Sequence, residues 1–146
     1  MRAYTFSLLA VLVLAVGCVS QLPRQPQTRG EIALEFVCEQ LNADCADLQP
    51  PKIEYVDLAA MGMPGAAGAF DPYNPYVIYL DYRLVDQDLI MRVIVHETMH
   101  FVDFHKQLTM VLGSDRRIVE GLAHMVDTMW DAQQHGKEYP VRVTVR

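Results

Sequence analysis

The second half of the chain contains a long, mostly apolar segment in which two histidines and a glutamate lie close together. Residues 87–112 have a helical pattern, and apolar side chains cover nearly every side of the predicted helix, which is typical of a buried helix. Within residues 89–104 the apolar pattern is interrupted by His96, Glu97 and His100. A buried polar group without a partner costs about 1–3 kcal/mol, so the fold has to supply partners for all three.

The spacing of the two histidines predicts a metal site on this helix. Four residues apart, they differ by about 40° around a helix axis and by about 6 Å along it, so both imidazoles can reach one ion. Glu97 lies about 100° from His96, where its carboxylate can accept a proton from a metal-activated water without binding the metal. This is the chemistry of the H-E-x-x-H pattern. The alternative is a pair of core histidines hydrogen-bonded to Glu97 and to nearby carboxylates.

A catalytic zinc ion needs a third protein ligand and an open position for water. The metzincin pattern would place glycine three residues and histidine six residues after His100, but the chain has Asp103 and Lys106 there. His105 would lie about 140° around the helix from His100 and would face away from the ion. We therefore expect the third ligand to come from another part of the chain.

Residues 118–124, Ile-Val-Glu-Gly-Leu-Ala-His, resemble the second-helix segment of gluzincin metallopeptidases. In that family a glutamate followed closely by small residues supplies the third zinc ligand, which here implies Glu120. The resemblance covers residues 76–127 and implies a zinc metallopeptidase in which Glu97 is the general base for hydrolysis of a peptide bond. The alternative for Glu120 is a surface charge near a helix start, which the helix dipole would also favour.

Supporting roles fall to residues near the predicted ligands. His124 and Asp127 lie within about 40° of Glu120 on a helix and so project toward the same site. Many gluzincins have an aspartate four residues after the ligand glutamate, where it orients a ligand histidine. Because His124 occupies that position, the resemblance leaves this role to Asp127 or Asp103. The candidate donors to a developing oxyanion are His124, Tyr79 and Tyr139.

The remaining pattern predicts one small α+β domain over residues 30–146. The expected elements are a helix over 30–42, strands over 53–58 and 76–82, a Gly- and Pro-rich loop over 59–75, a last helix capped by Ser114 or Asp115, and an edge strand or frayed tail over 141–146. The resemblance implies a zincin-like fold, with a short antiparallel or mixed sheet packed on the two ligand-bearing helices. In such folds an extended substrate pairs with an edge strand, for which residues 76–82 are the candidate.

The N-terminal segment predicts export. Arg2 is followed by an uncharged apolar run over residues 4–17, which is too short to span a membrane comfortably. Residues 14–18, Leu-Ala-Val-Gly-Cys, resemble a bacterial lipoprotein signal. The resemblance implies that residues 1–17 are removed, that Cys18 carries the lipid and that residues 18–29 form a flexible tether. The alternatives are an ordinary signal peptide or an uncleaved anchor.

Export also bears on the destination of the protein and on its other cysteines. No aspartate follows Cys18 as a retention signal, which favours the outer membrane of the bacterial envelope, on its periplasmic side. In an oxidising compartment Cys38 and Cys45 are expected to form a disulfide, and the alternative is two buried free thiols.

The formal net charge of −6 disfavours nucleic acid as a partner. The expected partners are a peptide or protein substrate and the membrane, while the oligomeric state is left open.

Two non-enzymatic functions compete with the peptidase hypothesis. A lipoprotein could hold zinc structurally, or keep a degenerate peptidase fold as a binding module in the envelope. A structural site would be closed by a fourth protein ligand, with His124 or Asp103 as the candidates. The other alternative is an envelope scaffold without metal.

Overall fold

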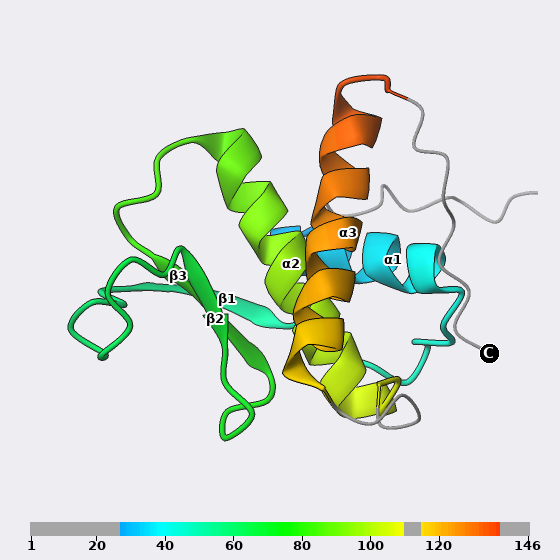
Figure 1. The fold of residues 1–146 in the computed structure, drawn as a ribbon, viewed down its shortest axis with the longest axis horizontal. Coiled ribbons are helices and arrows are strands. Elements are labelled where there is room, and N and C mark those ends of the chain that lie inside the picture. Colours follow the sequence, from blue (N-terminus) through cyan, green and yellow to red (C-terminus); the bar gives the residue numbers. More distant parts are fainter. Residues whose placement is uncertain (1–26, 110–114, 138–146) are drawn as a thin grey trace, which may run out of the picture.

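The computed structural model describes residues 27–109 and 115–137. These residues form an α+β fold with three helices and a three-stranded mixed sheet (Figure 1). The elements in chain order are α1 (Arg29–Leu41), β1 (Lys52–Val56), β2 (Gly68–Phe70), β3 (Val77–Asp81), α2 (Gln87–Lys106) and α3 (Arg116–Gln134). Among the described residues, no helix has the length and apolar character needed to cross a membrane.

Several sequence predictions concern residues outside the described ranges. They are the signal segment 1–17, the lipid-carrying Cys18, most of the 18–29 tether, Ser114 as a possible helix cap, Tyr139 and the tail 141–146. The tether ends slightly earlier than predicted, because α1 begins at Arg29. Thr28 caps this helix, and Thr28 and Glu31 each accept a hydrogen bond from the other's backbone N–H, which is a capping box.

The sheet has the strand order β1-β3-β2. β1 pairs with β3 in parallel and β2 pairs with β3 in antiparallel fashion, so the prediction that residues 76–82 form an edge strand is wrong. Four of the five residues of β3 are buried, in keeping with its central position between β1 and β2. The edge strand beside the helices is β2, a three-residue strand within the segment predicted as a loop.

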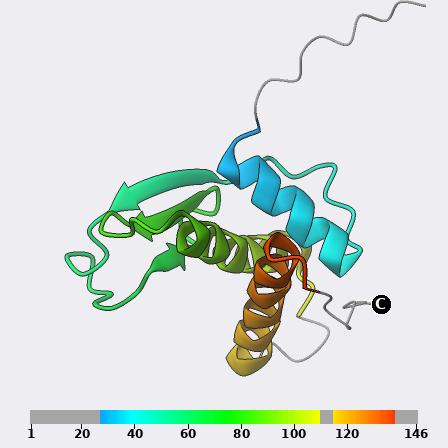
Figure 2. The same ribbon diagram turned by 90° about the horizontal axis from the view of Figure 1, so that it is seen from above.

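Helix α2 lies at the centre of the molecule, between the sheet and α3, and α1 packs across it (Figures 1 and 2). Its inward side carries Ile94, Val95, Met99 and Val102, all fully buried in the single core cluster. The same cluster takes the apolar side of α1 and the buried residues of β3. This packing fixes the axis of α2, and therefore the direction in which its polar side chains point.

The end of α2 differs from the predicted helix end at residue 112. The helix stops at Lys106, and Gln107 adopts the left-handed conformation with φ 54°. The Asp103 carboxylate accepts hydrogen bonds from the backbone N–H and the hydroxyl of Thr109, each at 2.8 Å. The Asp103 side chain thus accepts hydrogen bonds from the turn that follows the helix. This turn ends α2 six residues before the predicted end.

Helix α1 is tied to the loop that follows it. Cys38 and Cys45 form a disulfide, as the sequence predicts. The Phe36 ring packs edge-on against Trp130 of α3, with ring centroids 5.0 Å apart. The disulfide fixes the loop after α1 to that helix, and the ring contact packs α1 against α3.

Candidate metal centre

Helix α2 presents two neighbouring rows of side chains, each repeating every four residues as on one helix face. Arg92, His96 and His100 form the row that faces α3, where Asp127 contacts the first two and Glu120 the last two. Val93 and Glu97 form the row that faces β2, where Gly68 lies against both. The two rows of α2 therefore meet two different partners, α3 and β2.

His96, His100 and Glu120 form a group that could hold a metal ion. The two imidazole Nε2 atoms are 3.3 Å apart. Glu120 Oε2 is 3.6 Å from Nε2 of His96 and 3.7 Å from Nε2 of His100. Ligand atoms bound tetrahedrally to zinc at about 2.0–2.2 Å lie roughly 3.3–3.6 Å from one another. The two nitrogens and one oxygen thus have the chemistry and the spacing of three zinc ligands.

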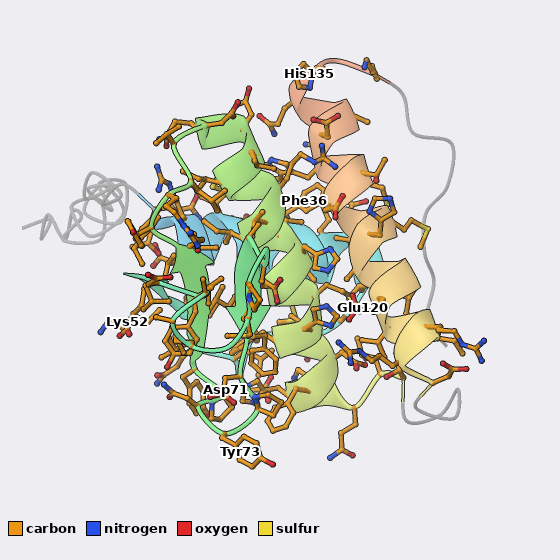
Figure 3. The ribbon with its side chains drawn as sticks, turned by 60° about the vertical axis from the view of Figure 1, so that its left-hand side comes forward. Phe36, Lys52, Asp71, Tyr73, Glu120 and His135 are labelled. Atoms are coloured by element: carbon orange, nitrogen blue, oxygen red, sulfur yellow. A yellow bond between two sulfur atoms is a disulfide. The ribbon has the colours of Figure 1, made fainter. Side chains whose placement is uncertain are left out.

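Glu120 reaches this group from the first turns of α3, where α3 runs beside α2 (Figure 3). Asp115 caps α3 by accepting from the Arg117 N–H, in agreement with one of the two predicted caps. The Glu120 side chain is 47% exposed, and its other oxygen is 3.7 Å from Nε of Arg116. Glu120 therefore faces both the histidines and the solvent.

Asp127 orients the first histidine. Its Oδ2 is 2.9 Å from Nδ1 of His96, which leaves Nε2 of that ring directed at the candidate ligand group. The hydrogen bond with Asp127 raises the pKa of His96 against the opposing effect of burial. Burial alone would raise the pKa of Asp127, but hydrogen bonds from His96 and Arg92 outweigh it and keep that pKa low. A carboxylate on the second ring nitrogen is the usual support of a metal-binding histidine.

Glu97 lies beside the ligand group and outside it. Its carboxylate accepts a hydrogen bond of 2.9 Å from the Phe70 N–H at the end of β2. Burial raises the pKa of Glu97 to about 6, against the opposing effects of His96 and of this N–H group. A carboxyl group with this pKa can take up and release a proton near neutral pH.

Gly68 allows β2 to approach α2 closely enough for this contact. A Cβ atom at residue 68 would lie 2.5 Å from Cγ1 of Val93 and 3.1 Å from Cγ of Glu97. Val93 is β-branched and cannot easily turn its side chain away within a helix. Any larger residue at position 68 would therefore push the edge strand away from Glu97.

A cleft of about 700 Å³ opens beside the ligand group. His96, Glu97, His100 and Glu120 lie along its polar side. Phe70 and Phe104 add apolar surface to the lining, and their ring centroids are 5.6 Å apart. The size and the mixture of a few polar groups with apolar walls are typical of a site for a small ligand or for part of a larger one.

Other predicted site residues lie elsewhere. Asp103 is on the cleft wall, but its carboxylate is bonded to Thr109 and to neither candidate histidine. His105 faces away from the ligand group, as expected, and its Nε2 is 2.9 Å from the Pro75 carbonyl oxygen. The Tyr79 hydroxyl accepts a hydrogen bond from Asn74 and does not line the cleft.

His124 also stands apart from the ligand group. Its side chain is 74% exposed, and its Nδ1 is 3.5 Å from Oδ2 of Asp127. It is absent from the residues that line the cleft. The structure thus places His124 behind Asp127, where it contacts the carboxylate that supports His96 instead of reaching the cleft.

Two functional features were not predicted from the sequence. Arg92 pairs with Asp127, although an arginine on a helix is most often a solvated charge. Its position four residues before His96, in the same helix row, was the available signal. The contact between β2 and Glu97 had no such local signal, since it depends on strand pairing across the sheet.

The arrangement can hold a divalent cation with three protein ligands and place a carboxylate base beside it. Among the described residues, no fourth metal-binding side chain completes the group, so ligand positions remain for water or a substrate oxygen. Comparison of the chain with protein-family models, with curated proteins and with solved structures gave no match.

Proposed function

We propose that this protein is a zinc-dependent metallopeptidase with a zincin-like fold, similar to the gluzincins. The observation that carries the proposal is the triangle of His96, His100 and Glu120 with Glu97 beside it in an open cleft. A structural zinc site would need a fourth protein ligand. The candidates for that role, His124 and Asp103, are turned toward Asp127 and Thr109 instead.

His96, His100 and Glu120 would hold the ion in the proposed reaction, and Asp127 would keep His96 in the right orientation. A bound zinc ion supplies a Lewis acid that polarises a carbonyl group and lowers the pKa of water toward 7. Glu97 takes a proton from the attacking water and delivers it to the amine that leaves. The Phe70 N–H holds the Glu97 carboxylate in place for both transfers.

Strand β2 is the proposed docking edge for an extended substrate, in place of residues 76–82. It pairs with β3 on one side and lines the cleft with Gly68, Ala69 and Phe70. In an antiparallel pair, alternate residues direct their backbone groups away from the partner strand. The Phe70 N–H is such a group, because it donates to Glu97 and not to β3, so β2 directs polar backbone groups toward the cleft.

The proposal also includes export as a lipoprotein anchored in the bacterial envelope through Cys18. The disulfide between Cys38 and Cys45 supports an oxidising compartment. Cys18→Ser should release the protein from the membrane fraction, because it removes the atom that would carry the lipid. Membrane fractionation equal to that of the wild type would contradict this part of the proposal.

The decisive experiment on function is Glu97→Gln, which preserves the size of the side chain but removes its ability to take a proton. Zinc content, measured by elemental analysis, should stay near the wild-type value. Hydrolysis of a peptide library should fall by about 10²–10⁴-fold. Glu54→Gln is the matched control, because Glu54 is on β1 and pairs with Lys52; it should leave both measurements unchanged.

Two results would contradict the proposed function. One is a zinc-loaded wild-type protein that cleaves no peptide of the library. The other is cleavage by the Glu97→Gln variant at the wild-type rate, which would show that Glu97 is not the base even if zinc is bound.

A further inference from the structure

The candidate site continues into a second, smaller cavity of about 270 Å³. This cavity and the large cleft have Gly68, His96 and Glu97 in common. The large cleft extends along α2 toward Phe104, and the small cavity extends the other way, toward Leu89. A chain lying across Glu97 would therefore have the large cleft on one side and the small cavity on the other.

The walls of the small cavity combine aliphatic side chains with the charged pair of Arg92 and Asp127 and with His96 and Glu97 of the candidate site. Ala67, Leu89 and Val93 provide aliphatic surface, while Arg92 and Asp127 provide the charges. Arg92 lines the cavity, and its side chain is 36% exposed. This combination suits a short aliphatic chain segment that ends in a group able to pair with a guanidinium.

Arg92 has unused hydrogen-bonding capacity. A guanidinium carries five N–H donors. Among the described residues, its partner is Asp127, through one contact of 3.3 Å from Nη2 to Oδ1. The Nε atom is buried without any partner. Arginine and carboxylate commonly form two parallel hydrogen bonds, and this pair forms one.

Asp127 is shared between Arg92 and other groups. Its Oδ2 accepts from His96 at 2.9 Å and is 3.5 Å from Nδ1 of His124. Its Oδ1 also accepts from the Thr128 hydroxyl at 3.4 Å. The carboxylate is therefore turned toward His96, which leaves the remaining donors of Arg92 for a second anion.

We propose that the small cavity binds a carboxylate of the substrate, on the residue next to the scissile bond, and that Arg92 selects it. This proposal rests on the proposed peptidase function. Two kinds of substrate supply such a carboxylate: a chain whose C-terminal residue enters the cavity, and a chain with an aspartate or glutamate side chain there. The volume is below the usual range of about 300–1,000 Å³ for small-molecule pockets, which favours a single residue.

The reaction on such a substrate is ordinary hydrolysis. The peptide C–N bond that precedes the bound residue breaks. Water gives its oxygen to the carbonyl carbon, which becomes a carboxylate, and both protons of the water end on the leaving amine, which is released as an ammonium group. When the carboxylate is the chain terminus, the product is a single amino acid, and the protein acts as a carboxypeptidase.

The test compares three acetylated peptides that differ only at the last residue. The first ends in leucine as the free acid, the second in leucine amide and the third in glutamate amide. Binding to the zinc-loaded Glu97→Gln protein is measured by calorimetry, and the cleaved bond in the wild type is identified by mass spectrometry. If the chain terminus supplies the carboxylate, the free acid should bind at least about tenfold more tightly than the leucine amide, as expected for a charged hydrogen bond. If a side chain supplies it, the glutamate amide should be the peptide that binds more tightly than the leucine amide.

Arg92→Gln should remove this preference, and Arg92→Lys should keep part of it. The readout is the ratio of the affinities for the leucine free acid and the leucine amide. If the substitution only disturbed Asp127 and thereby His96, both affinities would change together and the ratio would stay the same. Arg116→Gln is the matched control: Arg116 lines the large cleft, so this variant should keep the preference. Tight binding of the glutamate amide would identify the side-chain source of the carboxylate, and weak binding would identify the chain terminus.

Equal affinity for all three peptides, or an unchanged preference in Arg92→Gln, would overturn the proposed role of Arg92. Cleavage of the leucine amide at interior bonds would then still support the peptidase function. Conversely, the protein could cleave none of the peptides but still bind the free acid through Arg92. That result would support the carboxylate site and contradict the proposed peptidase function. The two failures are therefore distinguishable.

Discussion

The two sides of α2 differ in what they contribute. Ile94, Val95 and Met99 on the inward side are fully buried in the core, whereas the ionisable His96, Glu97 and His100 on the cleft side are partly buried. The inward side is part of the apolar core, and the cleft side carries the candidate metal ligands and Glu97. We infer that the core holds the helix in place so that three ionisable groups can stay close together. Stability and metal binding should therefore respond to different substitutions.

Met99→Ala tests the inward side and should have the largest effect. Truncation of a fully buried methionine costs about 2–5 kcal/mol, because it removes apolar contacts and leaves a cavity. Denaturant unfolding should show this loss in the free energy of unfolding. Val85→Ala is the control: Val85 is 84% exposed, and its loss should change stability by at most about 0.5 kcal/mol. Equal stability of the two variants would mean that Met99 is not part of a packed core.

Glu120→Ala tests the cleft side. Loss of one of three protein ligands should lower zinc affinity by more than the roughly 10–100-fold typical of losing an outer partner. Its effect on unfolding of the zinc-free protein should be small, since Glu120 is nearly half-exposed. His105→Ala is the comparison, because His105 packs against the Tyr76 and Phe101 rings and not at the ligand group. If competition with a chelator gave equal zinc affinities for both variants, Glu120 would not be a ligand.

The disulfide gives a third test, remote from the cleft. Replacing Cys38 and Cys45 together by serine removes a covalent closure over seven positions of sequence separation. The chain-entropy argument for such a short loop predicts a loss of about 2.5 kcal/mol in the free energy of unfolding. Zinc affinity of the folded protein should not change, because α1 supplies no ligand. A drop in zinc affinity at temperatures where the protein is fully folded would argue that α1 shapes the site.

The sequence predicted those parts of the site that depend on local spacing. His96 and His100 are one helical turn apart, and Glu97 follows from the same pattern. Glu120 came from the resemblance to gluzincins, and the structure places it within 3.7 Å of both histidines. His96, Glu97 and His100 could be predicted because helix periodicity alone brings them together, without knowledge of the rest of the fold.

The parts that the sequence did not predict depend on contacts between distant segments. β2 contains a glycine and an alanine and only one strong strand former, so its pairing with β3 supplies the preference that its sequence lacks. The same pairing makes β3 a central strand and moves the edge to β2. The early end of α2 was also missed, because the Asp103 side chain bonds to Thr109 at a place where no glycine or proline marks the turn.

Asp127→Asn is expected to have the smallest of these effects. Asparagine keeps an oxygen that can accept a hydrogen bond from Nδ1 of His96, but it removes the negative charge that supports the ring. Zinc affinity should fall by about tenfold, at the lower end of the range for an outer partner. The unfolding free energy should change less than in Met99→Ala, since no apolar contact is removed.

Asp103→Asn is the matched control for that change. Both aspartates were candidates to orient a ligand histidine; Asp103 lines the large cleft and Asp127 lines the small cavity. Because the Asp103 carboxylate accepts from Thr109, its substitution should weaken the turn after α2 while leaving zinc affinity within about twofold, as expected when no ligand loses its partner. If Asp103→Asn reduced zinc affinity as much as Asp127→Asn did, the ligand histidines would depend on the overall negative charge around the cleft. If only Asp127→Asn reduced zinc affinity, the hydrogen bond between Asp127 and His96 would be what orients the ligand histidine. The cleft side of α2 would then depend on α3 for its geometry, as the inward side depends on the core for its packing.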